Sequence, residues 1–192
     1  DLNYKDKFFS TVVILEVDRR PPQEIIDKIT TDCQISEKNL TLILTPTRSL
    51  SGCVQVVGRV LEVGMHKLHE IGFPLKKVID GFGSAPVPPP APDFLIGMGR
   101  TNDAILYGGQ VHLYVDVDDD EAYELAKRLP SSTSKDYGRT FAEIFKEYKY
   151  DFYQIDKLLF SPAKVIVTTL KTGKTFVSGE INTELVNQSF SK

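Results

Sequence analysis

The chain opens with a strand, a helix and a second strand in immediate succession. Residues 8–17 (FFSTVVILEV) are rich in β-branched and aromatic side chains and are short enough for a buried strand. Residues 23–33 then place several isoleucines on one side of a helix, and residues 40–44 (LTLIL) are again apolar. Strands joined through a helix tend to pair in parallel and to be covered by helices. The pattern therefore predicts an α/β fold with a mixed β-sheet and helices packed on it.

We expect one α/β domain over residues 1–192, because a chain of this length can form a sizeable core without disulfides. The segment 85–92 (APVPPPAP) must be extended, since proline lacks an N–H and has a fixed φ. Its alternative interpretation is a linker between domains. We favour a loop within one domain, because helix and strand patterns continue on both sides without a polar spacer.

The net charge of −3 gives no basic surface, so no nucleic-acid partner is expected. No apolar run reaches the length that spans a bilayer, and no signal-peptide pattern opens the chain. These features predict a cytoplasmic protein without a membrane partner. Cys33 and Cys53 have no metal-ligand spacing and lie in apolar surroundings, so both are expected to be buried free thiols. The acidic run 118–121 is expected to favour the N-terminus of a helix rather than to bind a metal.

The longest helical pattern covers residues 53–71, with Ser49 or Ser51 as a candidate N-cap and Gly72 as the terminating glycine. At 100° per residue its polar stripe holds Gln55, Arg59, Glu62, His66 and His69. One interpretation is a solvated face with an ordinary i,i+3 ion pair. Gly58 and Gly64 favour a sharper one, because glycines inside a helix often serve close packing or close approach of a ligand.

Glu62 beside Arg59 has two chemical possibilities. The neighbouring cation keeps the carboxylate ionised, which suits charge stabilisation. In a dry site, burial would instead raise the pKa of Glu62 toward the range of a general base. A carboxylate of this second kind could take a proton from a water molecule that attacks an electrophilic carbon, with the arginine holding the carboxylate in place.

Three further segments are candidates for ligand contacts. Residues 81–86 (GFGSAP) begin like a dinucleotide fingerprint, but Pro86 and the prolines after it exclude the helix which that motif needs, although the backbone could still line a pocket. Residues 97–109 (GMGRTNDAILYGG) could hydrogen-bond a polar heterocycle, or could form an Asx turn and a helix N-cap. Residues 130–138 (PSSTSKDYG) could bind an anion or form a plain loop with a cap.

Long motifs in this chain resemble the C-terminal part of the methenyltetrahydromethanopterin cyclohydrolase family. The matching segments agree in order and spacing; they are 45–62 (TPTRSLSGCVQVVGRVLE), 69–90 (HEIGFPLKKVIDGFGSAPVPPP), 97–109, 130–156 (PSSTSKDYGRTFAEIFKEYKYDFYQID) and 159–165 (LFSPAKV). The resemblance covers nearly the whole chain, but only the later part of the family's two-domain subunit.

The resemblance implies an activity and a site. The family hydrolyses the cyclic methenyl amidinium of 5,10-methenyltetrahydromethanopterin to the N5-formyl form, in the one-carbon metabolism of methanogens and methylotrophs. It uses neither a metal nor a prosthetic group, so the tetrahydromethanopterin derivative is the substrate. The family's Arg-x-x-Glu motif maps onto Arg59 and Glu62. Substrate contacts are predicted at Ser51, Gln55, Gly83, Thr101, Asn102, Asp103, Tyr107 and Ser134.

The resemblance also implies partners. The family forms homotrimers, and its N-terminal domain supplies one wall of the cleft. We therefore expect this chain to need an N-terminal half of the same enzyme. The alternative is a non-catalytic pterin-binding or assembly module that requires the same partner.

Overall fold

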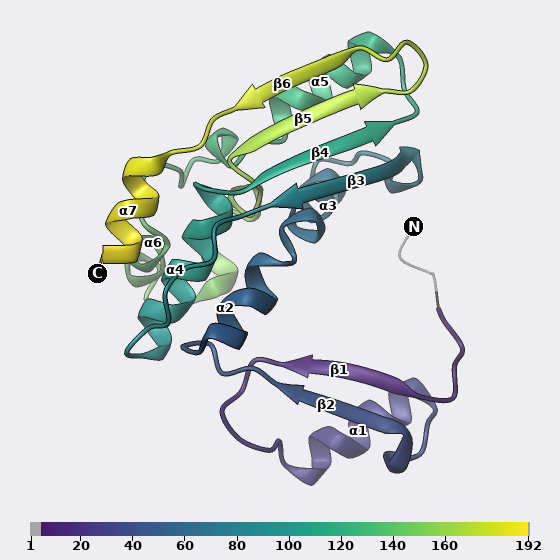
Figure 1. Cartoon of the computed structure of the whole chain (residues 1–192), viewed down its shortest axis with the longest axis vertical. Coiled ribbons are helices and arrows are strands. Elements are labelled where there is room, and N and C mark those ends of the chain that lie inside the picture. The colour runs from purple at the N-terminus through teal and green to yellow at the C-terminus, as the bar shows by residue number, and fades with distance from the viewer. Residues whose placement is uncertain (1–4, 192) are drawn as a thin grey trace.

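The computed structural model describes residues 5–191, and within them the strands fall into two sheets (Figure 1). The smaller sheet pairs β1 (Thr11–Leu15) with β2 (Leu40–Leu44) in parallel. The helix α1 (Gln23–Cys33) connects these strands and lies against one face of the pair (Figure 1). The opening strand–helix–strand pattern is therefore confirmed, and the predicted α/β class with it.

The larger sheet has the strand order β3–β4–β5–β6. The strands are β3 (Val78–Ser84), β4 (Gln110–Val115), β5 (Lys164–Thr169) and β6 (Thr175–Gly179). β4 and β5 are parallel, whereas both outer pairs are antiparallel, so this sheet is mixed as predicted. β5 and β6 form an antiparallel hairpin, and Gly173 lies in its turn with φ 75°.

One face of the larger sheet forms the main core. The helices α3 (Val60–Glu70) and α5 (Asp119–Arg128) lie behind the strands in Figure 1. Alternate residues of β4 and β5, among them Leu113 and Val167, are fully buried against this layer. Period-two burial of this kind is what the alternating residues of a half-covered strand produce.

A second apolar cluster lies beyond the ends of these strands. It contains α4 (Phe94–Leu106), α6 (Phe141–Glu147) and α7 (Thr183–Ser191), which group on one side of the molecule in Figure 1. Short 3-10 helices join the elements: η1 (Glu37–Asn39), η2 (Leu75–Lys77), η3 (Ser131–Thr133), η4 (Phe152–Gln154) and η5 (Lys157–Leu159).

The proline-rich segment 85–92 leads from β3 to α4, and β3 pairs with the β4 strand that follows α4. It is thus a loop inside one unit, as favoured above. Arg100 is 8% exposed and its Nη1 donates to the carbonyl oxygens of Pro89 at 3.2 Å and Pro90 at 2.7 Å. A buried guanidinium therefore holds the loop through the acceptors that proline retains.

The predicted continuous helix over residues 53–71 is wrong. α2 covers Leu50–Val57, Gly58 closes it, and α3 begins at Val60. Arg59 lies at the junction with φ −91° and ψ 15°, outside the helical range. Ser49 is the N-cap of α2 and accepts from the Gly52 N–H at 3.0 Å. Gly72, with φ 78°, follows α3 as expected for a terminating glycine.

The acidic run 118–121 lies at the N-terminus of α5. The N-terminal acids of α5 contact the β5–β6 turn: Asp118 pairs with Lys171 at 2.8 Å, and Asp119 pairs with Lys174 at 2.6 Å. The helix-terminus interpretation is consistent with this position, and the ion pairs with the two lysines also join α5 to the β5–β6 turn.

Cys53 is fully buried as predicted, but Cys33 is exposed at the end of α1, so the prediction for Cys33 is wrong.

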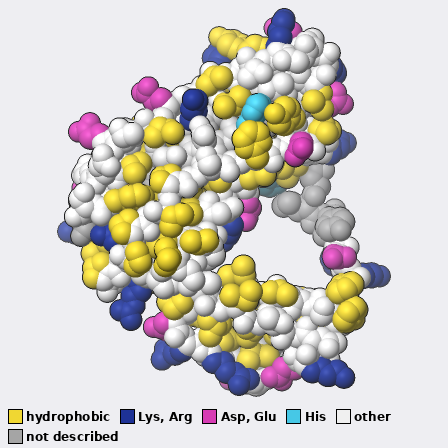
Figure 2. Space-filling model, in the orientation of Figure 1, with side chains coloured by type: hydrophobic (Ala, Val, Ile, Leu, Met, Phe, Trp, Pro, Cys, Tyr) yellow, Lys and Arg dark blue, Asp and Glu magenta, His cyan; other side chains and the backbone are white. Residues whose placement is uncertain are grey.

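Both sheets leave apolar side chains uncovered. On the smaller sheet Val12 is 63% exposed and Ile14 53% exposed, and on the larger sheet Phe82 and Val177 are each 59% exposed. Figure 2 shows hydrophobic side chains gathered over the part of the chain that holds the smaller sheet and over the part that holds the larger one, with a hollow between these two parts. In the described part of the chain, no helix is long and apolar enough to span a membrane.

Candidate active site

Arg59 and Glu62 form a two-pronged ion pair. Nε of Arg59 donates to Oε2 of Glu62 and Nη2 donates to Oε1, both at 2.8 Å. The break between α2 and α3 allows this geometry, because Arg59 precedes the first turn of α3 while Glu62 belongs to it. Parallel hydrogen bonds between a guanidinium and a carboxylate are stronger and more directional than a simple charge contact.

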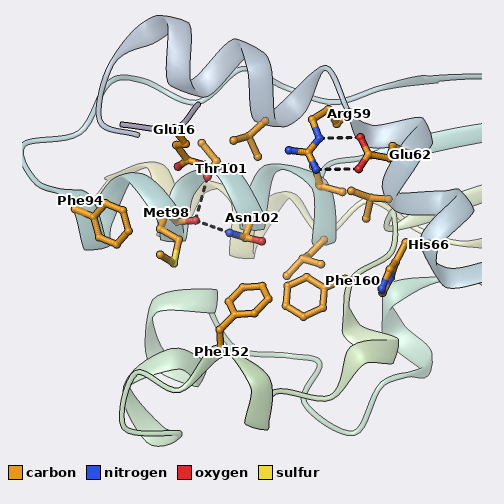
Figure 3. Close-up of a pocket in the computed structure, with 14 residues that line it drawn as sticks. Glu16, Arg59, Glu62, His66, Phe94, Met98, Thr101, Asn102, Phe152 and Phe160 are labelled. Atoms are coloured by element: carbon orange, nitrogen blue, oxygen red, sulfur yellow. Dashed lines mark hydrogen bonds and ion pairs between the residues drawn. The ribbon is translucent and has the colours of Figure 1, made fainter. Parts of the chain in front are cut away.

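The pair lines a pocket of about 500 Å³ (Figure 3). Its walls come from α2, α3 and α4, from the residue after β1, and from the segments around η4 and η5. The pocket is enclosed mainly by apolar side chains, with a few polar groups that can fix the orientation of a ligand. Its lining residues are Glu16, Val56, Arg59, Glu62, Val63, His66, Phe94, Met98, Thr101, Asn102, Ile105, Leu106, Phe152 and Phe160.

Glu62 is held ionised in this structure. Its hydrogen bonds from Arg59 lower the pKa of Glu62 below the ordinary carboxyl value, against the smaller opposing effect of partial burial. The Arg59 side chain is 56% exposed and the Glu62 side chain 61% exposed. Of the two possibilities raised by the sequence, the ionised carboxylate is the one present here, and the pKa is not raised.

His66 lies one turn after Glu62 on the same face of α3 and also lines the pocket (Figure 3). Its Nε2 lies 3.7 Å from Oε1 of Glu70, and the His66 ring contributes to the lowered pKa of Glu62. The polar stripe predicted from the helical wheel therefore reaches the pocket through Arg59, Glu62 and His66.

Two of the predicted substrate contacts, Thr101 and Asn102, lie in the pocket on α4. Thr101 Oγ1 donates to the carbonyl oxygens of Gly97 and Met98, and Asn102 Nδ2 donates to that of Met98 at 2.9 Å (Figure 3). Both residues are inside α4, so the alternative of an Asx turn or N-cap here is wrong. The N-cap of α4 is Asp93, which accepts from the Ile96 N–H at 2.9 Å.

Two other predicted contacts lie on α2, outside the lining of this pocket. Gln55 is close to its margin, with Nε2 at 3.5 Å from Oε2 of Glu16. Ser51 is in the first turn of α2, with its hydroxyl 2.8 Å from that of Ser49.

The remaining predicted contacts lie at packing positions. Gly83 lies in β3 under α3, where a Cβ would come within 2.9 Å of Val60 Cγ1. Asp103 is fully buried and accepts from the backbone N–H of Phe141 at 2.7 Å, joining α4 to α6. Tyr107, also fully buried, donates to the carbonyl oxygen of Arg139. Ser134 donates to Oδ2 of Asp156 at 2.7 Å. The structure does not bring these side chains to the pocket.

Sequence reasoning missed the apolar wall of the pocket and one acid. Glu16 comes directly after β1, whereas Phe152 lies in η4 and Phe160 directly after η5. Helical or strand periodicity does not identify residues in such short or irregular segments. The two phenylalanines lie within the long segments 130–156 and 159–165, which was the available signal for them, whereas Glu16 lies outside both segments.

The chain is similar in sequence to known proteins. Residues 1–190 match the model of a family described as cyclohydrolase (MCH). The methenyltetrahydromethanopterin cyclohydrolase of Methylobacillus flagellatus is 58% identical over 99% of this chain, which spans 58% of the relative. The enzyme of that name from Xanthobacter autotrophicus is 52% identical over 99% of this chain, which spans 56% of it. For that of Methylosinus trichosporium the identity is 51%, over 99% of this chain and 73% of the relative.

Fold and site together define an α/β protein with an Arg–Glu ion pair in a largely apolar pocket. The family match covers nearly every residue, including both members of the pair. The chain belongs to the cyclohydrolase (MCH) family.

Proposed function

We propose that this chain carries the acid–base site of a methenyltetrahydromethanopterin cyclohydrolase. The reaction is hydrolysis of the cyclic methenyl group of 5,10-methenyltetrahydromethanopterin to the N5-formyl form. The observation that carries this proposal is the two-pronged Arg59–Glu62 pair at the wall of a ligand-sized pocket. The relatives' names and the family match support it.

Glu62 is the group that acts on water. The carboxylate accepts a proton from a water molecule as its oxygen bonds to the amidinium carbon, which gives a neutral tetrahedral intermediate. The bond from that carbon to N10 then breaks, and Glu62 returns the proton to N10. The remaining hydroxyl becomes the formyl carbonyl and its proton goes to solvent. The net reaction consumes one water and one cation and releases one proton.

Arg59 is the positioning residue in this scheme. Its fork fixes the plane of the Glu62 carboxylate, and its charge keeps that carboxylate deprotonated and ready to accept. A carboxylate close to a cationic substrate also favours binding of the charged cyclic form. The reaction needs no metal or prosthetic group in this proposal, because the substrate itself carries the electrophilic cation.

We also propose that an N-terminal half of the same enzyme covers this pocket, in the cytoplasm and within a homotrimer. The exposed side chains of the pair and the uncovered apolar residues of the smaller sheet support a covering partner. The uncovered face of the larger sheet, with Phe82 and Val177, supports contact between subunits. Light scattering of the assembled protein, with Val177→Lys as the variant, tests the trimer: the variant is expected to lose it.

The activity is tested through the near-ultraviolet absorbance of the methenyl substrate, which the formyl product lacks. The chain is assayed together with the N-terminal half of a close relative, against spontaneous hydrolysis. Glu62→Gln is expected to remove the accelerated decay. Glu124→Gln is the matched control, because Glu124 forms an i,i+3 pair with Lys127 at 2.9 Å on α5, away from the pocket.

Unchanged decay in Glu62→Gln would contradict the mechanism. Binding of the pterin without any turnover, in the assembled protein, would instead support a non-catalytic pterin-binding or assembly module.

A further inference from the structure

Two phenylalanine rings form part of the pocket wall that the acid–base mechanism does not use. Phe152, in η4, and Phe160, directly after η5, have ring centroids 4.9 Å apart with 28° between their planes. Both line the pocket that contains Arg59 and Glu62. Their planes are nearly parallel, and the two rings stack against each other.

The surface is supported from behind. Phe141, which is fully buried at the start of α6, lies 6.1 Å from each ring, centroid to centroid. The short helices that present the rings are capped by Asp151, which accepts from Tyr153 N, and by Asp156, which accepts from Leu158 N. The rings are therefore held in place, although Phe152 remains 42% exposed.

The rings face the ion pair across the pocket. Figure 3 shows Phe152 and Phe160 on one side of the cavity, with Arg59 and Glu62 on the other and Met98 and Asn102 along a third wall. The face of an aromatic ring carries partial negative charge and attracts cations. A flat cation in this cavity would thus have a carboxylate on one side and the two phenylalanine rings on the other.

We propose that Phe152 and Phe160 form a stacking wall that selects the cationic, planar ring of the substrate over the neutral, ring-opened product. This rests on the proposed function for the identity of the ligand. The chemical class recognised is a planar amidinium fused to a heterocycle. The wall lowers product affinity relative to substrate, because opening the ring removes both the charge and the planarity that stacking requires.

The test measures binding and turnover separately in the assembled protein. Phe152→Leu keeps an apolar side chain but removes the π-face, and Phe152→Tyr restores it. The matched control is Tyr153→Leu, since Tyr153 is the neighbouring residue in η4, is 92% exposed and does not line the pocket. The ligands are the methenyl pterin cation and its neutral N5-formyl counterpart, titrated at equilibrium in a Glu62→Gln background, which does not turn the cation over, by following the pterin absorbance and fluorescence. KM and kcat are measured with Glu62 present.

Phe152→Leu is expected to weaken binding of the cation roughly tenfold, to change binding of the neutral form much less, and to raise KM more than it lowers kcat. Phe152→Tyr should recover most of the affinity for the cation. An equal loss of affinity for both ligands, or no loss of affinity for either, would contradict the stacking proposal without contradicting hydrolysis by Glu62. Charge-selective binding without turnover would keep the wall and contradict the proposed activity. If neither ligand binds the parent protein, the wall is also wrong.

Discussion

Arg59 lies in the break between α2 and α3 and donates two hydrogen bonds of 2.8 Å to the carboxylate of Glu62, three residues later. Lys127 and Glu124 also form an i,i+3 pair, on α5, but with a single contact of 2.9 Å, because an ammonium group cannot make the two parallel hydrogen bonds of a guanidinium. The two hydrogen bonds engage both carboxylate oxygens, so the orientation of Glu62 depends on Arg59.

Loss of the carboxylate is expected to remove most of the turnover. Glu62→Gln keeps the size of the side chain but cannot accept the proton from water. General-base catalysis contributes about 10²- to 10⁴-fold, so kcat should fall by that order. Decay of the methenyl absorbance measures it. A fall of similar size in Glu124→Gln would attribute the effect to folding rather than to chemistry.

The pH profile should reveal the influence of Arg59 on Glu62. Because Arg59 lowers the pKa of Glu62, the base stays deprotonated throughout the neutral range, and kcat/KM declines only as the pH falls through that lowered value. Arg59→Gln removes the cation, so the acidic limb should move to higher pH. Arg139→Gln, which removes an exposed partner of Glu147, serves as the comparison. If the acidic limb does not move in Arg59→Gln, Arg59 does not control the ionisation of Glu62.

The buried Lys67 should make the free energy of unfolding rise with pH in the alkaline range. Its side chain is fully buried, donates to Thr133 Oγ1 at 2.9 Å and to the Leu158 carbonyl, and burial lowers the pKa of Lys67 to about 8. Between that value and the ordinary lysine pKa, the unfolded chain binds more protons than the folded one, so stability increases as the pH rises.

Urea denaturation measures this effect. From about pH 7.5 to about pH 9.5, the free energy of unfolding should rise by about 2 kcal/mol more in the parent protein than in Lys67→Met. Lys127→Met, at an exposed position, should behave like the parent. A flat difference between the parent and Lys67→Met would mean that Lys67 is not desolvated when charged.

Two glycines that pack α3 on the larger sheet should respond oppositely to alanine. At Gly83 a Cβ would meet Val60 Cγ1 at 2.9 Å and the Gln110 carbonyl oxygen at 3.0 Å, so Gly83→Ala should destabilise by about 1–3 kcal/mol. At Gly64 a Cβ would lie 3.5 Å from Val111, an ordinary contact inside a helix, so Gly64→Ala should stabilise by up to about 1 kcal/mol. Thermal unfolding compares the two, and equal shifts would contradict the packing argument.

The cysteines offer a direct check on the fold. Cys33 is exposed, whereas Cys53 is fully buried and burial raises the pKa of its thiol. A chromogenic disulfide reagent should therefore label Cys33 quickly in the native chain and Cys53 only after unfolding. Cys33→Ser should abolish the fast phase, and rapid native labelling that survives in this variant would show that Cys53 is accessible.

Local patterns predicted the elements of this fold better than their limits. The α1 helix and β2 strand appear at the predicted residues, because their apolar periodicity is strong and turn-forming residues flank them. The break at Gly58 was not predicted, since a helical wheel continues through a glycine unless packing decides otherwise. The division into two sheets was also not predicted, because partner choice among strands depends on contacts distant in sequence.

The candidate site divides in the same way. Arg59, Glu62 and His66 share a helix face, and Thr101 and Asn102 lie on α4, so helical spacing and a family motif could find them. Phe152 and Phe160 reach the pocket from 3-10 turns and loops, where spacing carries no geometric information. Gly83 and Asp103 have the residue types of a binding site, but tight packing and a buried backbone contact already account for them.

The smaller sheet has a consequence for anyone handling this chain in isolation. β1 (TVVIL) and β2 (LTLIL) contain no charge and no proline, and among residues 5–191 each strand has one neighbour in its sheet. Uncharged strands with a free hydrogen-bonding edge recruit further strands, including those of identical molecules. Preparations of the chain alone will consequently lose material through concentration-dependent association at this edge, and solubility will improve once a covering segment is co-expressed.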